Sequence, residues 1–269
     1  MPTITFGIPL LSRRVARDWP AAQRLLANTL RSVFNQSAPD IKVIVACHEP
    51  PEIDEIRDPR VTVAPVDFDI PRFQWEQEID RMRKLEVIAA AHRKQGGGWL
   101  FILDADDLVS RTLAQRIAAA KTKAVVVRNG YRLDVRRGMA QPLNRFWKKC
   151  GSCVAVNWAE DELPLVPLSD NPPVFHQYAE TRHYLLPEFF AKRGWSASYE
   201  DMGAAYLINH GQNQSDIIVS DNLKWRLYFM LTRWKPWTPA LDAEFGSDAA
   251  SRTGAIYTGD AKFSTEHRA

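Results

Sequence analysis

One apolar run, "WLFIL" over residues 99–103, constrains the fold more than any other feature of this chain. A short, uninterrupted apolar stretch of this kind is typical of a strand buried on both faces, as in parallel sheets covered by helices. The three glycines at 96–98 end the preceding helical pattern, and Asp104, Asp106 and Asp107 follow the run directly. The sequence therefore predicts a central strand with three carboxylates at its carboxyl end.

Strand and helix patterns alternate along the first half of the chain. Strands are expected at 3–10, 41–47, 60–66, 99–104 and 124–130, and helices at 18–36, 74–94 and 110–120, the last beginning at Ser110. This βαβ order favours an α/β fold with an open, mostly parallel sheet flanked by helices. Ligands of such sheets bind outside the carboxyl ends of the strands, which is where the carboxylates lie.

The second half of the chain is less regular and predicts a smaller mixed β/α part. Residues 128–143 have the pattern of a hairpin, and 146–158 of two strands around a Gly-Ser turn. We expect one domain with a ligand-binding half at 1–125, a second half at 126–219, and a C-terminal helix and tail at 220–269. The tail after Pro239 is rich in small and polar residues, which predicts a loosely held segment.

Composition narrows the class of protein. The chain has 269 residues, 45% of them hydrophobic, enough for a substantial core. A net charge of +3, from 35 basic and 32 acidic residues, indicates no nucleic-acid partner. Three cysteines form no disulfide framework, the first residues lack a signal-peptide pattern, and no run approaches the roughly 18 apolar residues of a membrane span. We expect a cytoplasmic protein.

The carboxylate cluster predicts a cation site. Three like charges within four positions repel one another unless a cation or hydrogen-bond donors offset them. Carboxylate oxygens suit Mg²⁺ or Mn²⁺, and so few protein ligands suggest that phosphate oxygens complete the shell. The alternative is that Asp106 and Asp107 merely begin a solvated loop.

The segment "GWLFILDADDLVSRTL" (98–113) resembles the DXD region of GT-A glycosyltransferases, particularly the family 2 group. The start "TFGIPLLSRR" and the stretch "LANTLRSVFNQSAPDIKVIVACHEPPE" are similar to that family's first strand and to its following helix and second strand. The resemblance covers roughly residues 3–130. It implies a metal-dependent inverting transfer of sugar from a nucleotide-diphosphate sugar to a hydroxyl of a glycan or lipid-linked acceptor, with Mn²⁺ or Mg²⁺ as cofactor.

The resemblance also implies roles for particular residues. Those at the nucleotide are Pro9, Leu10, His48, Glu49, Lys84, Asp104 and Ala105; those at the metal are Asp106 and His210; those beside the donor and acceptor sugars are Asp107, Gly151 and Ser152. Asp107 is also expected to orient its loop, and His183 to lie near the acceptor. Arg81, Arg83 and Lys84 have an alternative interpretation as a solvated helix face, and His210 as a structural histidine.

Inverting transfer needs a general base that takes the proton of the acceptor hydroxyl. Glu200-Asp201 resembles the Glu-Asp pair of family 2 enzymes, in which the aspartate is the base. Asp161-Glu162 is a second candidate pair, and an exposed turn is the alternative for either.

Two further patterns have competing interpretations. Cys150-X-X-Cys153 has the spacing of zinc and redox sites, but too few other ligands accompany it, and a structural role is favoured. Aromatic and basic residues interleave over 220–237, which suits either a helix docked on the domain or peripheral contact with the inner face of a membrane. The rival functions are a haloacid-dehalogenase-like phosphatase or phosphotransferase, and a non-catalytic nucleotide-sugar-binding protein.

Overall fold

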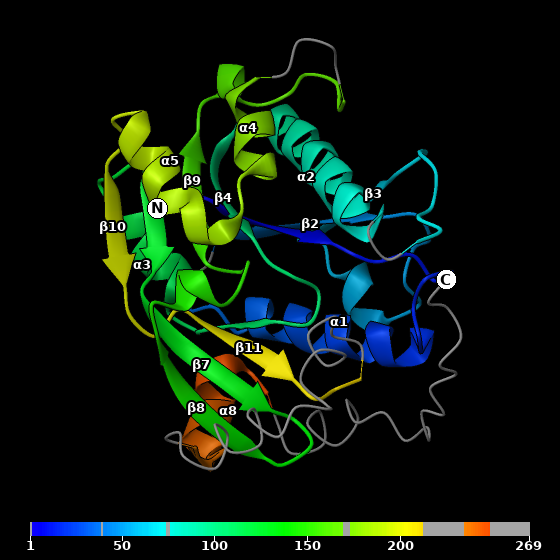
Figure 1. Ribbon diagram of the computed structural model, residues 1–269, viewed down its shortest axis with the longest axis vertical. Helices are drawn as coiled ribbons and strands as arrows, with labels where there is room; N and C mark the ends of the chain where they lie inside the picture. The colour runs from blue at the N-terminus through cyan, green and yellow to red at the C-terminus, as the bar shows by residue number, and fades with distance from the viewer. Residues whose placement is uncertain (1, 39, 74–75, 169–172, 212–233, 248–269) are drawn as a thin grey trace, which may run out of the picture.

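The computed structural model describes residues 2–38, 40–73, 76–168, 173–211 and 234–247. These residues form an α/β fold with two open sheets (Figure 1). The strands are β1 (Ile4–Pro9), β2 (Ile41–Cys47), β3 (Val61–Pro65), β4 (Gly98–Ile102), β5 (Leu108–Val109), β6 (Ala124–Val127), β7 (Asn129–Asp134), β8 (Met139–Asn144), β9 (Val154–Trp158), β10 (Ala197–Glu200), β11 (Ala204–Ile208) and β12 (Lys235–Pro236). The α-helices are α1 (Trp19–Phe34), α2 (Glu76–Lys94), α3 (Leu113–Ala119), α4 (Val174–Glu180), α5 (Leu186–Lys192) and α8 (Pro239–Phe245).

The larger sheet has seven described strands in the order β10-β6-β9-β4-β1-β2-β3. The strands β1, β2, β3 and β4 run parallel, as the alternation of strands and helices predicts. Strand β9 lies antiparallel between β4 and β6, so the sheet is mixed at this side. The carboxyl ends of β1 and β4 are neighbours, which places Pro9 beside the aspartate cluster.

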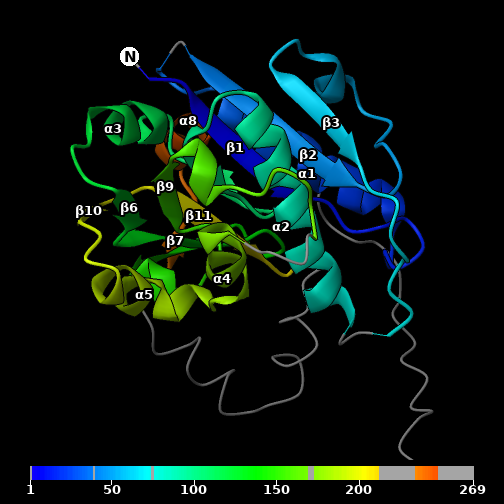
Figure 2. The same cartoon turned by 90° about the horizontal axis from the view of Figure 1, so that it is seen from above.

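Helices cover both faces of the larger sheet. Figure 1 shows α2 above β2 and α1 below it, and Figure 2 shows α4 and α5 next to one another beside α2. Helix α1 begins at the N-cap Asp18, whose Oδ1 accepts a hydrogen bond from the backbone N–H of Ala21 at 2.9 Å. Its Leu26, Leu30 and Val33 pack in the core of the larger sheet.

The smaller sheet has the described order β12-β8-β7-β11-β5. Its β7–β8 hairpin confirms the one expected over 128–143. Leu25 of α1 packs in a separate cluster with residues of this sheet, so α1 lies between the two sheets. Strand β5 belongs to the first half of the chain, while β9 and β10 of the second half join the larger sheet, so the halves expected on either side of residue 125 share both sheets.

Three local predictions are wrong. Helix α3 begins after Thr112 rather than at Ser110, because residues 108–109 form β5 and the Ser110 side chain contacts Glu244 instead. Residues 146–148 form a 3₁₀ turn, η2 (Phe146–Lys148), rather than a strand. The segment after Pro239 is helical over α8, and its Phe245 is fully buried against Tyr131.

The aromatic and basic pattern at 220–237 lies outside the described residues up to position 233, and its last part forms β12. Within the described ranges, no helix combines the length and the apolar character that crossing a bilayer requires.

Candidate active site

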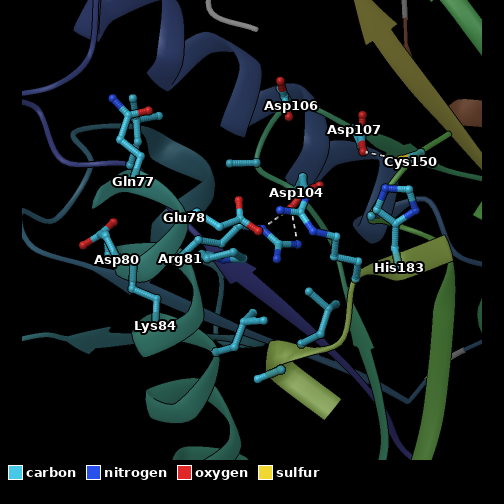
Figure 3. A pocket seen from close by; sticks show the side chains of 18 of the residues that line it. Gln77, Glu78, Asp80, Arg81, Lys84, Asp104, Asp106, Asp107, Cys150 and His183 are labelled. Carbon is cyan, nitrogen blue, oxygen red and sulfur yellow. Dashed lines mark hydrogen bonds and ion pairs between the residues drawn. The ribbon is translucent and has the colours of Figure 1, made fainter. Parts of the chain in front are cut away.

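A cavity of about 480 Å³ opens at the carboxyl ends of β1 and β4. One wall is helix α2, and the aspartate loop at 104–107 faces it (Figure 3). Segments 149–151 and 178–186 contribute further residues to the lining of the cavity. Of the residues predicted from the sequence, the cavity is lined by Pro9, Leu10, Lys84, Asp104, Ala105, Asp106, Asp107, Gly151 and His183. The expected position of the site, at the end of the central strand, is therefore the position of the cavity.

Asp104 is held by Arg81, for which the sequence also allows a place on a solvated helix face. The Arg81 guanidinium donates to Asp104 Oδ1 through Nε at 3.2 Å and Nη2 at 2.9 Å (Figure 3). The Asp104 charge raises the pKa of Arg81. The backbone N–H of Asp104 donates to Ser152 Oγ at 2.9 Å. This aspartate is consequently fixed from two sides.

Asp107 is buried and joins its loop to the segment at 150–152. Its Oδ2 accepts from Ser152 Oγ at 2.6 Å and from Cys150 Sγ at 3.0 Å, while Oδ1 has no hydrogen-bond partner among the described residues. Burial, together with the charges of Asp106 and Asp104, raises the pKa of Asp107 well above its usual range. Asp107 therefore holds the loop in place, as expected for it.

The backbone of segment 150–152 passes close to the Asp104–Arg81 ion pair. A Cβ on Gly151 would lie 2.9 Å from Asp104 Oδ2 and 3.2 Å from Arg81 Nη2, so only glycine fits beside this ion pair without displacement. Ser152 is fully buried and does not line the cavity, because its hydroxyl is engaged by Asp104 and Asp107. The structure does not bring Ser152 to a position where it touches a sugar.

The Cys150-X-X-Cys153 motif has a structural environment. Both thiols are buried and form no disulfide, and burial raises the pKa of each. No group of three or more histidine, cysteine or acidic side chains among the described residues has the arrangement of a metal site. These positions agree with the structural role that the sequence favours.

Asp106 and His210 come together from distant parts of the sequence. The ring Nε2 of His210 lies 3.2 Å from Asp106 Oδ2, and the histidine side chain is fully buried. The register explains the contact: Ala205 of β11 pairs antiparallel with Leu108 of β5, so the residues after Ala205 run back alongside the aspartate loop. A carboxylate and an imidazole at this distance can share one cation.

Lys84 belongs to a buried charge network. Its Nζ donates to Asp80 Oδ2 at 2.6 Å, and Asp80 Oδ1 lies 2.7 Å from His48 Nε2. Burial lowers the pKa of Lys84, although the Asp80 charge opposes the effect. The solvated-face interpretation holds only for Arg83, which is exposed, whereas Arg81 and Lys84, three residues apart on one helix face, line the cavity.

Two predicted nucleotide contacts, His48 and Glu49, do not line the cavity. His48 is buried against Asp80, and Glu49 accepts from the Ser12 hydroxyl at 3.0 Å and from the Arg13 backbone N–H at 3.1 Å. Neither side chain is among those that line the cavity. His48 contacts Asp80, which is a residue of the wall, whereas the partners of Glu49 do not line the cavity.

The structure does not bring the predicted base into the cavity. The Asp201 carboxylate accepts two hydrogen bonds from Arg128, both at 2.8 Å, and one from Asn129 at 2.7 Å, and the Arg128 contact lowers its pKa. Glu200 is the last residue of β10, and neither it nor Asp201 lines the cavity. The alternative pair, Asp161 and Glu162, lies in the 3₁₀ turn η3 (Glu160–Glu162), also outside the cavity.

Sequence patterns missed several residues of the cavity wall. Glu78 and Glu180 are carboxylates of the wall, and Lys149 and Arg182 are cations of it. Glu78 shares the face of α2 that carries Arg81, so helical spacing could have indicated it. The other three lie in segments whose approach to the aspartate loop depends on tertiary contacts.

The sequence matches no protein-family model, and a search of curated proteins gave no match. Among solved structures, it aligns with one from Bacillus anthracis described as a glucose-1-phosphate thymidylyltransferase in complex with sucrose. The alignment covers 95% of this chain and 98% of that chain, with 12% sequence identity and a TM-score of 0.39. Similarity at this level does not identify the fold or the function of this chain.

Proposed function

We propose that this protein is a glycosyltransferase that moves a sugar from a nucleotide-diphosphate sugar to a hydroxyl acceptor. The observation that carries the proposal is the pairing of Asp106, which lines the cavity together with Asp104, with the buried His210. The cavity lies at the carboxyl ends of parallel strands, where such sheets bind nucleotides.

The donor would occupy the part of the cavity between β1 and α2. Pro9 and Leu10 supply an apolar surface there, and Lys84 supplies a buried cation. An apolar wall with a few fixed polar groups suits a nucleoside. Arg81 holds Asp104 in a single position beside this surface, so that the carboxylate is oriented before the donor binds.

The residues at the aspartate loop fit a divalent cation whose coordination shell would contain both protein side chains and oxygens of a diphosphate. Asp106 and His210 would hold Mn²⁺ or Mg²⁺, and the small number of protein ligands leaves positions for phosphate oxygens. Such an ion would offset the negative charge that develops on the departing diphosphate. The buried Asp107 would keep the loop fixed through its contacts with Cys150 and Ser152.

In the proposed reaction the acceptor oxygen bonds to the anomeric carbon while the bond from that carbon to the diphosphate breaks. The proton of the acceptor hydroxyl passes to a carboxylate base. Asp201 can serve only if its ion pair with Arg128 opens, whereas Glu180 already lines the cavity with an exposed side chain. We therefore take Glu180 as the alternative base to Asp201.

Of the rival functions, a haloacid-dehalogenase-like phosphatase is disfavoured because its nucleophile normally follows the first strand, and Asp104 follows β4. A non-catalytic nucleotide-sugar-binding protein has one specific observation in its favour, the engagement of Asp201 by Arg128 and Asn129. Such a protein would bind the donor and never consume it.

A thermal-shift titration with UDP, GDP, dTDP and CMP, each with and without Mn²⁺, tests the proposal. A ligand that binds only the native state raises the melting temperature by mass action. We expect one nucleoside diphosphate to stabilise the protein in a Mn²⁺-dependent manner, and Asp106→Asn to abolish the metal dependence. No stabilisation by any nucleotide would refute the assignment. Consumption of the matching nucleotide sugar would then separate the enzyme from the binding protein.

A further inference from the structure

Two further cations, Lys149 and Arg182, line the cavity. Lys149 follows the turn η2, and Arg182 precedes the 3₁₀ turn η4 (His183–Leu185). The two segments are adjacent, because a ring nitrogen of His183 is hydrogen-bonded to the Trp147 backbone carbonyl. Lys149 and Arg182 therefore reach the cavity from neighbouring segments.

These two side chains differ from the other cations of the wall. Arg81 is paired with Asp104, and Lys84 with Asp80. Lys149 and Arg182 are exposed, and the described residues provide neither of them with an acidic partner.

The acids of the wall contact groups other than these two cations. Glu180, two residues before Arg182, lies 3.4 Å from His176 Nε2, and Asp106 lies beside His210. Glu78 shares the α2 face of Arg81 and is close enough to contribute to the raised pKa of that arginine. Among the described residues, none of these acids forms an ion pair with Lys149 or Arg182.

We propose that Lys149 and Arg182 bind an anionic group, a phosphate or a carboxylate, carried by the acceptor. An arginine fork and a lysine point charge together suit a phosphate or a carboxylate, which the guanidinium binds through two parallel hydrogen bonds. Tyr184 also lines the cavity with 44% of its surface exposed, and offers an aromatic face for the apolar side of a sugar ring. The acceptor is then an acidic sugar or a sugar or lipid phosphate rather than a neutral glycan.

The assignment to the acceptor rests on the proposed function. The donor diphosphate is already accounted for by the site at Asp106 and His210. Lys149 and Arg182 come from segments other than β1 and α2, to which Pro9 and Lys84 of the proposed nucleotide surface belong.

Isothermal titration calorimetry tests the proposal directly. The probes are glucose 6-phosphate, glucuronate and citronellyl phosphate, which present a sugar phosphate, a sugar carboxylate and a lipid phosphate, with methyl glucoside as the neutral probe. We expect at least one anionic probe to bind at least tenfold more tightly than methyl glucoside, with affinity that falls as salt is added. The probe that binds most tightly identifies the source of the anionic group.

Variants separate this site from general charge effects. The double variant Lys149→Gln/Arg182→Gln should weaken binding of the anionic probe at least tenfold. The matched control, Arg145→Gln/Lys148→Gln, removes the same charge from exposed residues of the neighbouring turn that do not line the cavity, and should leave the affinity within about twofold of the native value.

The outcomes distinguish this proposal from the proposed function. Equal binding of methyl glucoside, or an unchanged affinity in the double variant, would overturn the anion site even if nucleotides bind. If the double variant instead loses the thermal shift produced by the nucleoside diphosphate, the two cations serve the donor and the proposal is wrong. Anion binding without any nucleotide binding would retain the site and refute the glycosyltransferase.

Discussion

Substitution of Lys84 by methionine should destabilise the protein strongly. The Lys84 side chain is 1% exposed and its partner Asp80 only 8%, with 2.6 Å between Nζ and Oδ2. Breaking a buried ion pair by removing one partner leaves the other charge uncompensated, which costs about 3–5 kcal/mol. His48 remains in contact with Asp80 and limits the loss, so we expect the lower end, about 3 kcal/mol. That is a large fraction of a typical unfolding free energy of roughly 5–15 kcal/mol.

A double-mutant cycle measures the interaction between Lys84 and Asp80, with urea denaturation of the native protein, the two single variants and the double variant. Lys84→Met and Asp80→Leu should each be strongly destabilising, whereas the double variant, which leaves neither charge buried, should recover most of the stability. We expect a coupling of at least about 2 kcal/mol. Arg83→Met, one position away on the exposed face of α2, is the control and should change stability by less than about 0.5 kcal/mol. Additive single effects, or a Lys84→Met cost no larger than that of Arg83→Met, would refute the buried-pair argument.

Three further predictions test the rest of the site and its supports. Gly151→Ala should cost less than about 1 kcal/mol in urea denaturation, because the atoms nearest its Cβ, Asp104 Oδ2 at 2.9 Å and Arg81 Nη2 at 3.2 Å, end partly exposed side chains that can move; by displacing Asp104 it should weaken nucleotide binding. Burial raises the pKa of Glu86, so the native state binds a proton at this carboxyl more tightly than the unfolded chain does. The free energy of unfolding should therefore fall as the pH rises from about 4.3, the ordinary pKa of a glutamate, through the raised pKa. Glu86→Gln should remove this pH dependence, which denaturation at several pH values measures. Burial raises the pKa of the Cys47 thiol to about 11, so iodoacetamide should not modify it at about pH 8 until denaturant is added, and mass spectrometry showing rapid native-state labelling would contradict this burial.

Much of the larger sheet could be predicted because its signals are local. The run before Asp104 is apolar at every position, and the strand it forms is buried on both faces. The bounds of β2 at Ile41–Cys47 agree with the expected strand, since a β-branched run between turn residues has few alternatives. Both α1 and α2 likewise begin and end within about two residues of their expected bounds, a normal scatter for helix ends.

The composition of the cavity wall could not be predicted in the same way. Segment 178–186 lines the cavity, and the aromatic rings of Tyr178 and Phe175 pack on Trp158 of β9. That strand in turn lies antiparallel between β4 and β6, a pairing between residues far apart in the sequence. Asp201 has the sequence context of a base, yet its contact with Arg128 depends on β10 pairing with β6.

The sequence by itself determined the α/β class, the central strand and the carboxylates at its end, because hydrophobic period and turn residues act over a few positions. Only the tertiary structure decided which polar groups meet there: Arg81 on Asp104, His210 beside Asp106, and Lys149 and Arg182 in the lining of the same cavity. Those contacts depend on strand register and on packing between distant segments. A side chain's neighbours across a fold are set by the lowest free energy of the whole chain, and no local pattern encodes them.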